Sequence, residues 1–164
     1  TKNINKYMKV SEILLELRQG LSAYTKQQFP NWPEYVLNDF IYKGIKTIPP
    51  DEIKEYIQSI KKEYPVKQWK LENLKITPDI FDSETQRRLK LRQGGSANPF
   101  GVPKDAERHS TQAAMIQKQG VSKEPIILIK QGSKYELLEG WHRTIQHLKV
   151  FPDGYNGPAW VGYI

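Results

Sequence analysis

The chain has 164 residues, a length typical of a single domain, and its 38% hydrophobic and 11% aromatic content is that of a protein that folds. It has no cysteine, which excludes thiol catalysis, thiolate metal sites and disulfide bonds. The formal net charge of +7 lies mostly after residue 66, and it fits either a phosphate-bearing partner or ordinary solubilising charge. No apolar run approaches about 18 residues and the first residues do not read as a signal peptide, so we expect a cytoplasmic protein that binds no membrane.

Residues 1–66 are expected to form a helical N-terminal extension of three helices. In the first helix, apolar residues recur at helical spacing and Gly20 is the expected stop. The second helix follows the run Pro-Asn-Trp-Pro at 30–33, carries Pro33 in its first turn and ends near Gly44.

The third helix is expected to begin at Pro50 and to stop before Pro65, with acidic residues at its start and lysines at its end that complement the helix dipole. The extension contains no histidine and no Gly-rich loop, so we expect a docking element and not a second catalytic domain. Its apolar stripes either pack within the chain or bind a protein partner, with Trp32 and Tyr35 as the expected contact residues.

Residues 67–164 are expected to form a second domain that combines strands with helices, which makes the chain an α+β protein. Short apolar runs bounded by Gly, Pro and Ser predict strands, and longer periodic runs predict helices. The expected elements are a strand over 69–76, a helix from Asp105 that stops at Gly120, a buried strand over 125–129, a turn at 131–133, a strand over 135–139, a helix from Trp141 to about Leu148, and a final strand within 154–164.

The strongest site-like feature is the start of the helix that follows Gly140. Exposed backbone N–H groups and the positive end of the helix dipole make such a start a ready anion site. Gly140 lets a phosphate approach the backbone, Arg143 supplies a permanently charged fork, and His142 adds a donor that titrates near neutral pH. The expected phosphate- or nucleotide-binding residues are Gly140, Trp141, His142, Arg143 and Thr144.

Acid–base chemistry beside this motif is expected from Glu139 or His142, and a carboxylate there could also hold Mg²⁺ next to a bound triphosphate. A plain salt bridge between Glu139 and Arg143 is the alternative. Glu136 and Glu139 are three residues apart, which on a regular strand places them on opposite faces. His142 and His147 are five residues apart and do not share a helix face, so no metal site is expected.

A basic run lies earlier in the chain, ahead of a segment over 94–103 that is rich in Gly and Pro. Cations beside such a loop suit the phosphates of a nucleic acid, and a solvated helix face is the alternative. The expected nucleic-acid-binding residues are Arg87, Arg88, Lys90 and Arg92, together with Arg108 and His109 after the loop.

The run from Lys123 to Leu148, preceded by a helix ending in Gly120, resembles the ParB/sulfiredoxin-like superfamily. Its members show a helix that ends in Gly, a Pro-Ile strand, a hairpin of the form Gly-x-Tyr-x-Leu-x-x-Gly, and then Gly-x-x-Arg at a helix start. The resemblance covers roughly residues 67–164. It implies a small mixed β-sheet with packed helices, to which the helical extension is added.

The resemblance also implies that Gly140 and Arg143 bind phosphate, with ATP or CTP and Mg²⁺ as the implied cofactors. Members of the superfamily are CTP-binding DNA-partition proteins, nucleases, kinases that use ADP or ATP, and sulfiredoxins. Trp141 stands where sulfiredoxins have their catalytic cysteine, so sulfiredoxin chemistry is excluded.

Two functional classes stay open. One is an enzyme, either a nucleotide-dependent phosphotransferase or NTPase, or a nuclease. The other is a non-catalytic DNA- or nucleotide-binding module, or a structural component of a larger assembly.

Overall fold

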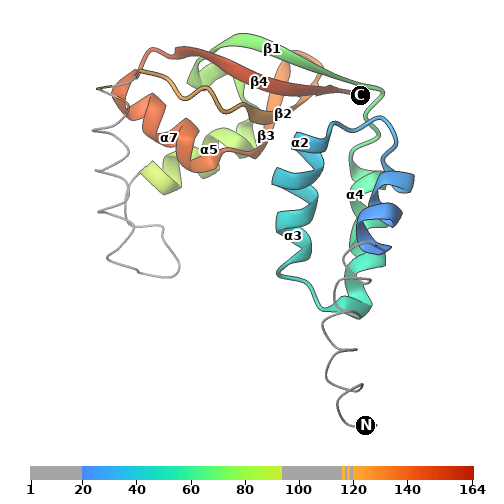
Figure 1. The fold of residues 1–164 in the computed structure, drawn as a ribbon. Helices are drawn as coiled ribbons and strands as arrows, with labels where there is room; N and C mark the ends of the chain where they lie inside the picture. Colours follow the sequence, from blue (N-terminus) through green and yellow to red (C-terminus); the bar gives the residue numbers. More distant parts are fainter. Residues whose placement is uncertain (1–19, 94–115, 117, 119) are drawn as a thin grey trace, which may run out of the picture. The chain divides into compact units, whose positions relative to one another are not determined.

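A computed structural model describes residues 20–93, 116, 118 and 120–164 (Figure 1). Within it the chain divides into two compact units between Pro65 and Val66. The first unit is helical, and the second combines a sheet with helices.

The N-terminal unit begins, in its described part, with a helix over residues 20–28. One continuous helical stretch follows, in which a π-helical turn joins two short α-helical turns, and a last helix enters through a 3₁₀ turn. These elements are α2 (Glu34–Val36), η1 (Leu37–Tyr42), α3 (Lys43–Ile45), η2 (Pro50–Glu52) and α4 (Ile53–Glu63).

Two of the expected helix boundaries, at Gly20 and at Pro33, are wrong. Gly20 is itself helical and the helix continues from it to Gln28, because one glycine costs only about 1 kcal/mol in a run of good helix formers. The second helix ends at Ile45, one residue after Gly44, as expected; the missing side chain of Gly44 leaves room for the Tyr56 ring, whose Cζ would lie 3.0 Å from an added Cβ. Pro33 precedes the first turn as an extended N-cap residue with φ −60° and ψ 148°.

The apolar stripes of this unit are buried, and Trp32 belongs to its core. The Trp32 ring lies 4.5 Å from the Phe29 ring and 6.5 Å from the Phe40 ring, measured between centroids. Trp32 is therefore not an exposed anchor for a partner, whereas Tyr35 is half-buried. Among the described residues of the unit, the buried apolar ones are Phe29, Trp32, Val36, Leu37, Ile41, Ile53, Ile57, Ile60 and Tyr64.

The second unit contains a four-stranded mixed sheet with the order β1-β4-β2-β3, which confirms the α+β class and the small mixed sheet. β2 and β4 are parallel, and the other two pairs are antiparallel. The elements are β1 (Gln68–Ile76), η3 (Pro78–Ile80), α5 (Ser83–Gln93), β2 (Ile126–Gln131), β3 (Lys134–Glu139), α7 (Trp141–Val150) and β4 (Tyr155–Tyr163).

Helices α5 and α7 lie side by side against one face of this sheet (Figure 1). Leu89 of α5 and Ile145 and Leu148 of α7 are buried against strand residues that alternate toward that face. The strand residues in this core are Ile76, Ile126, Leu128, Leu137, Tyr155, Ala159 and Val161. Burial of Ile145 and Leu148 against the sheet fixes the position of α7, and with it the turn at Gly140.

Two glycines perform the turn functions expected of them. Gly132 takes φ +62° in the two-residue turn between β2 and β3. Gly120 takes φ +78°, and its N–H donates to the Ile116 carbonyl at 2.8 Å, which closes the preceding helix. Apart from Ile116 and Lys118, the helix expected from Asp105 lies outside the described residues.

The expectation that Glu136 and Glu139 occupy opposite faces of β3 is wrong. The register shifts between Ile127 and Leu128, so Glu136 pairs with Ile129 while Glu139 pairs with Ile127. An extra residue in one strand of an antiparallel pair is a β-bulge, and it changes which side chains share a face. Both glutamates therefore lie on the face opposite the one that carries α5 and α7.

Candidate functional site

The turn into α7 depends on Gly140, which has φ +95° and acts as the N-cap residue of the helix. A Cβ at this position would lie 2.6 Å from Cγ2 of Ile126, so β2 and this turn are in close contact. The Thr144 N–H donates to the Gly140 carbonyl at 2.9 Å, which is the first hydrogen bond of the helix. The N–H groups of Trp141, His142 and Arg143 lie before it, in the turn where a helix offers its N–H groups no carbonyl of its own. The first turn of α7 thus presents the positive end of the helix dipole.

Arg143 is bound by a residue that the sequence did not indicate. Its Nη1 donates to the Glu124 carbonyl at 2.7 Å and lies 3.5 Å from Oε2 of the same residue. The carboxylate that the sequence offered as an alternative partner was Glu139. Arg143 keeps 21% of its side chain exposed, and the Glu124 side chain keeps 77%. An anion that binds Arg143 must therefore compete with an exposed carboxylate.

The last turn of α5 and the first turn of α7 meet through Arg92 and Trp141. The Arg92 guanidinium lies 4.9 Å from the centroid of the Trp141 ring. Trp141 itself packs against the core of the sheet. The basic run and the Gly140 motif are 48 residues apart in the sequence, yet the fold brings their ends together.

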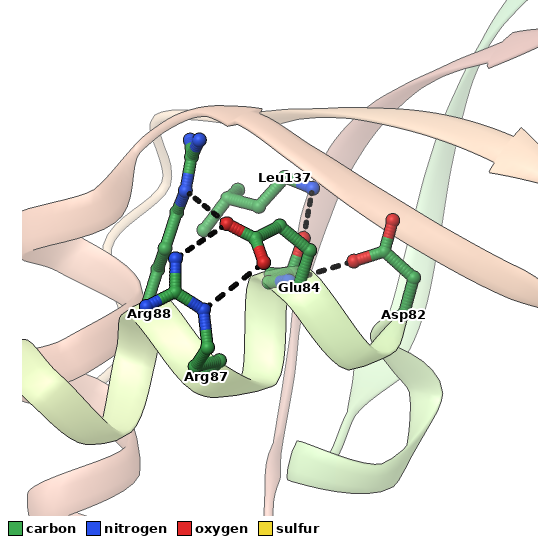
Figure 2. Close-up of polar contacts among 6 residues, drawn as sticks. Asp82, Glu84, Arg87, Arg88 and Leu137 are labelled. Carbon is green, nitrogen blue, oxygen red and sulfur yellow. Dashed lines mark hydrogen bonds and ion pairs between the residues drawn. The ribbon is translucent and has the colours of Figure 1, made fainter.

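Two of the four cations on α5 are bound by an acidic residue of the same helix (Figure 2). Glu84 accepts two hydrogen bonds from Arg87, at 2.7 and 3.0 Å, and one from Nε of Arg88 at 3.1 Å. The hydrogen bonds from Arg87, and then the one from Arg88, lower the pKa of Glu84 to about 2. Lys90 and Arg92 are exposed farther along the helix.

The start of α5 is anchored by a cap and by a contact with β3 (Figure 2). Asp82 accepts the Thr85 N–H at 2.7 Å, which is the arrangement of a helix N-cap. The Thr85 hydroxyl, which is buried, accepts the Leu137 N–H at 3.4 Å. These contacts hold α5 in place along β3, so the direction of its basic residues is set by the fold.

Thr144 does not belong to the site, although the sequence placed it there. Its side chain is fully buried and its N–H is used by the Gly140 carbonyl. The same face of α7 carries His147, which is 3% exposed and packs on the Tyr155 ring at 4.6 Å. Burial, followed by the charge of Arg143, lowers the pKa of His147, and burial raises the pKa of Tyr155 to about 12.

The two expected acid–base residues are placed differently. His142 is exposed in the first turn of α7. Glu139 ends β3 on the face opposite α7, because the bulge puts it in register with Ile127. The described residues contain no group of three His, Asp or Glu side chains that could hold a metal ion.

Some expected site residues lie outside the described residues, namely Arg108, His109 and the segment over 94–103. Two glutamates that bind expected site residues were missed. The position of Glu84, three and four residues before Arg87 and Arg88, is a readable helical pattern. Glu124 and Arg143 are 19 residues apart and belong to different elements, so their contact could not be read from the sequence.

A further cluster on the sheet was also missed. The ammonium groups of Lys70 and Lys130 lie 5.3 and 5.8 Å from the centroid of the Tyr163 ring. The Tyr163 hydroxyl donates to Glu72 at 2.6 Å, and burial followed by this carboxylate raises the pKa of Tyr163. These two lysines thus contribute to contacts within the sheet.

Compared with family models, with curated proteins and with solved structures, the chain matches none of them. In the part of the chain that the structure describes, no helix is long and apolar enough to span a membrane.

Proposed function

We propose that the second unit is a phosphate-binding domain that recognises a nucleotide or a nucleic acid at the start of α7. The observation that carries this proposal is the contact between Arg92 and Trp141. It places a cation of α5 beside the helix start that Gly140 opens, so two basic features of the sequence form one surface.

The electrostatics of this surface favour an anion with more than one charge. The α7 dipole is positive at this end, Arg92 lies beside it, and Arg143 belongs to the first turn of the helix. A guanidinium stacked on an indole keeps its N–H edges available, and these edges match phosphate geometry. The cations Arg87, Arg88 and Lys90 extend the surface along α5 and suit the backbone of a nucleic acid.

Binding without catalysis is the function that this geometry supports best. A phosphate held at α7 would lie on the helix-bearing side of the sheet, whereas Glu139 is on the opposite face. Catalytic roles for Glu139 and His142, with ATP or CTP and Mg²⁺ as cofactors, belong to the enzyme alternative. That alternative is a nucleotide-dependent phosphotransferase, an NTPase or a nuclease.

The proposal includes a ParB/sulfiredoxin-like fold for this unit. What supports it is the order of the elements: a helix end at Gly120, β2, the hairpin to β3, and α7 opened by Gly140. We propose further that the N-terminal helices bind a protein partner. The location proposed for the protein is the cytoplasm.

Ligand-dependent thermal unfolding tests the phosphate site. Pyrophosphate, ADP, ATP or CTP at about 100 times its dissociation constant should add about 2.7 kcal/mol to the free energy of unfolding. Arg92→Ala and Arg143→Ala should each reduce this gain, while Lys149→Ala, an exposed cation at the other end of α7, should leave it unchanged. The proposal fails if none of these ligands raises the melting temperature.

Turnover assays separate binding from catalysis. Hydrolysis of ATP and CTP and nicking of a plasmid are measured with and without Mg²⁺. A stabilised protein without turnover is a binding module. Turnover that is lost in Glu139→Gln or His142→Gln, with ligand stabilisation retained, would identify the enzyme instead.

A further inference from the structure

The segment 121–124, which leads into β2, contacts α7 at two places one helical turn apart. The Ser122 N–H donates to Nε2 of His147 at 3.1 Å. Glu124 accepts from Nη1 of Arg143 through its carbonyl at 2.7 Å, with its carboxylate 3.5 Å away. The same short segment therefore binds a buried histidine and the arginine of the proposed phosphate site.

The bond from Ser122 requires His147 to be neutral. An Nε2 that accepts a hydrogen bond carries no proton, so the imidazole proton resides on Nδ1. Nδ1 is buried and has no hydrogen-bond partner among the described residues, so none of the carboxylates described accepts from it.

The groups that face His147 also favour its neutral form. Arg143 of α7 and the Tyr155 ring of β4 lie close to it, and the buried hydroxyls of Thr144 and Tyr155 have no hydrogen-bond partner among the described residues. The charged residues of the contacting segment are Lys123 and Glu124, and Glu124 is bound to Arg143. Burial and the Arg143 cation together lower the pKa of His147.

We infer that the segment 121–124 keeps the phosphate site closed by placing Glu124 on Arg143, and that protonation of His147 opens the site. This inference rests on the proposed function and adds its regulation. A protonated Nε2 is a donor that faces the Ser122 N–H, so the hydrogen bond is lost and the segment loosens. Glu124 then no longer competes for Arg143, and an incoming dianion takes its place.

The coupling is reciprocal. A dianion bound at Arg143 neutralises the cation next to His147, which favours the imidazolium. Anion binding should therefore raise the affinity of His147 for a proton by the same factor by which protonation raises the affinity for the anion.

Sulfate is the probe for this inference, because it has phosphate geometry and its charge stays constant over the range in which histidine titrates. The full-length chain is titrated with sulfate at about pH 7.5 and at about pH 5.5, against chloride of equal ionic strength. Binding is followed by the amide shifts of the first turn of α7. All proteins carry His142→Gln, so that His147 is the only histidine left in α7.

Three variants isolate the two contacts. In the parent protein, which carries only His142→Gln, sulfate should bind several-fold more tightly at the lower pH. Adding His147→Gln, whose amide oxygen can still accept from Ser122, should remove this dependence on pH. Adding Glu124→Gln should strengthen binding about twofold to fivefold at the higher pH, as expected for loss of an exposed ion pair. Asp153→Asn, a control at an exposed position with the same change in charge, should leave sulfate binding at the higher pH unchanged.

The outcomes separate this inference from the proposed function. If no protein binds sulfate at either pH, the phosphate site itself is wrong. If sulfate binds with the same affinity in every variant and at both pH values, the site stands and the inference is wrong. If His147→Gln does not fold, the Ser122 amide shift is followed in the parent protein, and a shift that does not change with the titration of His147 overturns the inference.

Discussion

The guanidinium of Arg92 lies 4.9 Å from the centroid of the Trp141 ring, which joins the end of α5 to the start of α7. Arg92 belongs to the basic run and Trp141 to the motif that follows Gly140, so this pair defines the candidate site. The indole of Trp141 thus holds a cation of α5 at the start of α7.

Replacing Trp141 should weaken anion binding without unfolding the domain. Trp141→Leu keeps apolar contact with the core but removes the ring on which Arg92 lies. A cation–π contact at an exposed site contributes about 0.5–1 kcal/mol, so we expect a twofold to fivefold rise in the dissociation constant of pyrophosphate, measured by calorimetry. Trp141→Phe should recover part of the loss, and equal affinities in all three proteins would contradict the role given to the ring.

Removing the charge of Glu84 should strengthen binding to DNA. Glu84→Gln releases Arg87 and Arg88 from their ion pairs, so both can contact phosphates. We expect a slope of log K against log salt of about −2 to −3 for the wild type and a slope steeper by about 1 for the variant. The double variant Arg88→Glu, Arg92→Glu should weaken binding to all sequences alike.

The control for this experiment is Glu55→Gln, an exposed glutamate of α4 that has the same change in net charge. It should leave the slope as in the wild type. Identical salt dependence in Glu84→Gln and the wild type would mean that the basic run is a solvated helix face.

Replacing Gly140 should destabilise the second unit more than replacing another glycine with positive φ. Gly140→Ala combines left-handed strain of about 1–2 kcal/mol with a close contact to Ile126, for a total loss of about 2–5 kcal/mol. Gly132→Ala has the strain alone, because nothing lies within 4 Å of its added Cβ. Urea unfolding of both variants measures the difference, and equal losses would show that contact with β2 is unimportant.

Acidification should destabilise the fold through His147. Because the pKa of His147 is lowered in the folded state, the unfolded state binds the proton more strongly. The full stability is therefore present above the unfolded value of about 6.5 and is lost as the pH falls from there toward the folded value. His147→Gln should flatten this part of the stability profile, measured by thermal unfolding at constant salt; an unchanged profile would exclude His147 as its source.

The second unit should fold without the N-terminal helices. Its main core of strands, α5 and α7 is made entirely of residues after Val66. A fragment over 66–164 should unfold cooperatively in urea and retain binding of pyrophosphate. An aggregated fragment would mean that the N-terminal helices complete the core and are not a separate docking element.

Local patterns in the sequence were sufficient for most elements of the second unit. The apolar run Ile126–Ile129, the Gly132 turn and the helix after Gly140 were all predicted from neighbouring residues and are confirmed. Strands, turns and helix starts of this kind depend on residues only a few positions apart, so they can be predicted from a single sequence. The helix end expected at Gly20 was wrong, because glycine permits a helix to end but does not require it.

The sequence by itself determined which groups are present for chemistry: no thiol, an excess of cations, and a glycine with Arg143 at a helix start. Only the tertiary structure decided which of these groups meet. The bulge in β3 moves Glu139 away from α7, Glu124 binds Arg143 across 19 residues, and Arg92 reaches Trp141 from another helix. Such contacts depend on strand register and on how helices pack on the sheet, and these are set by burial of the whole core and not by neighbouring residues.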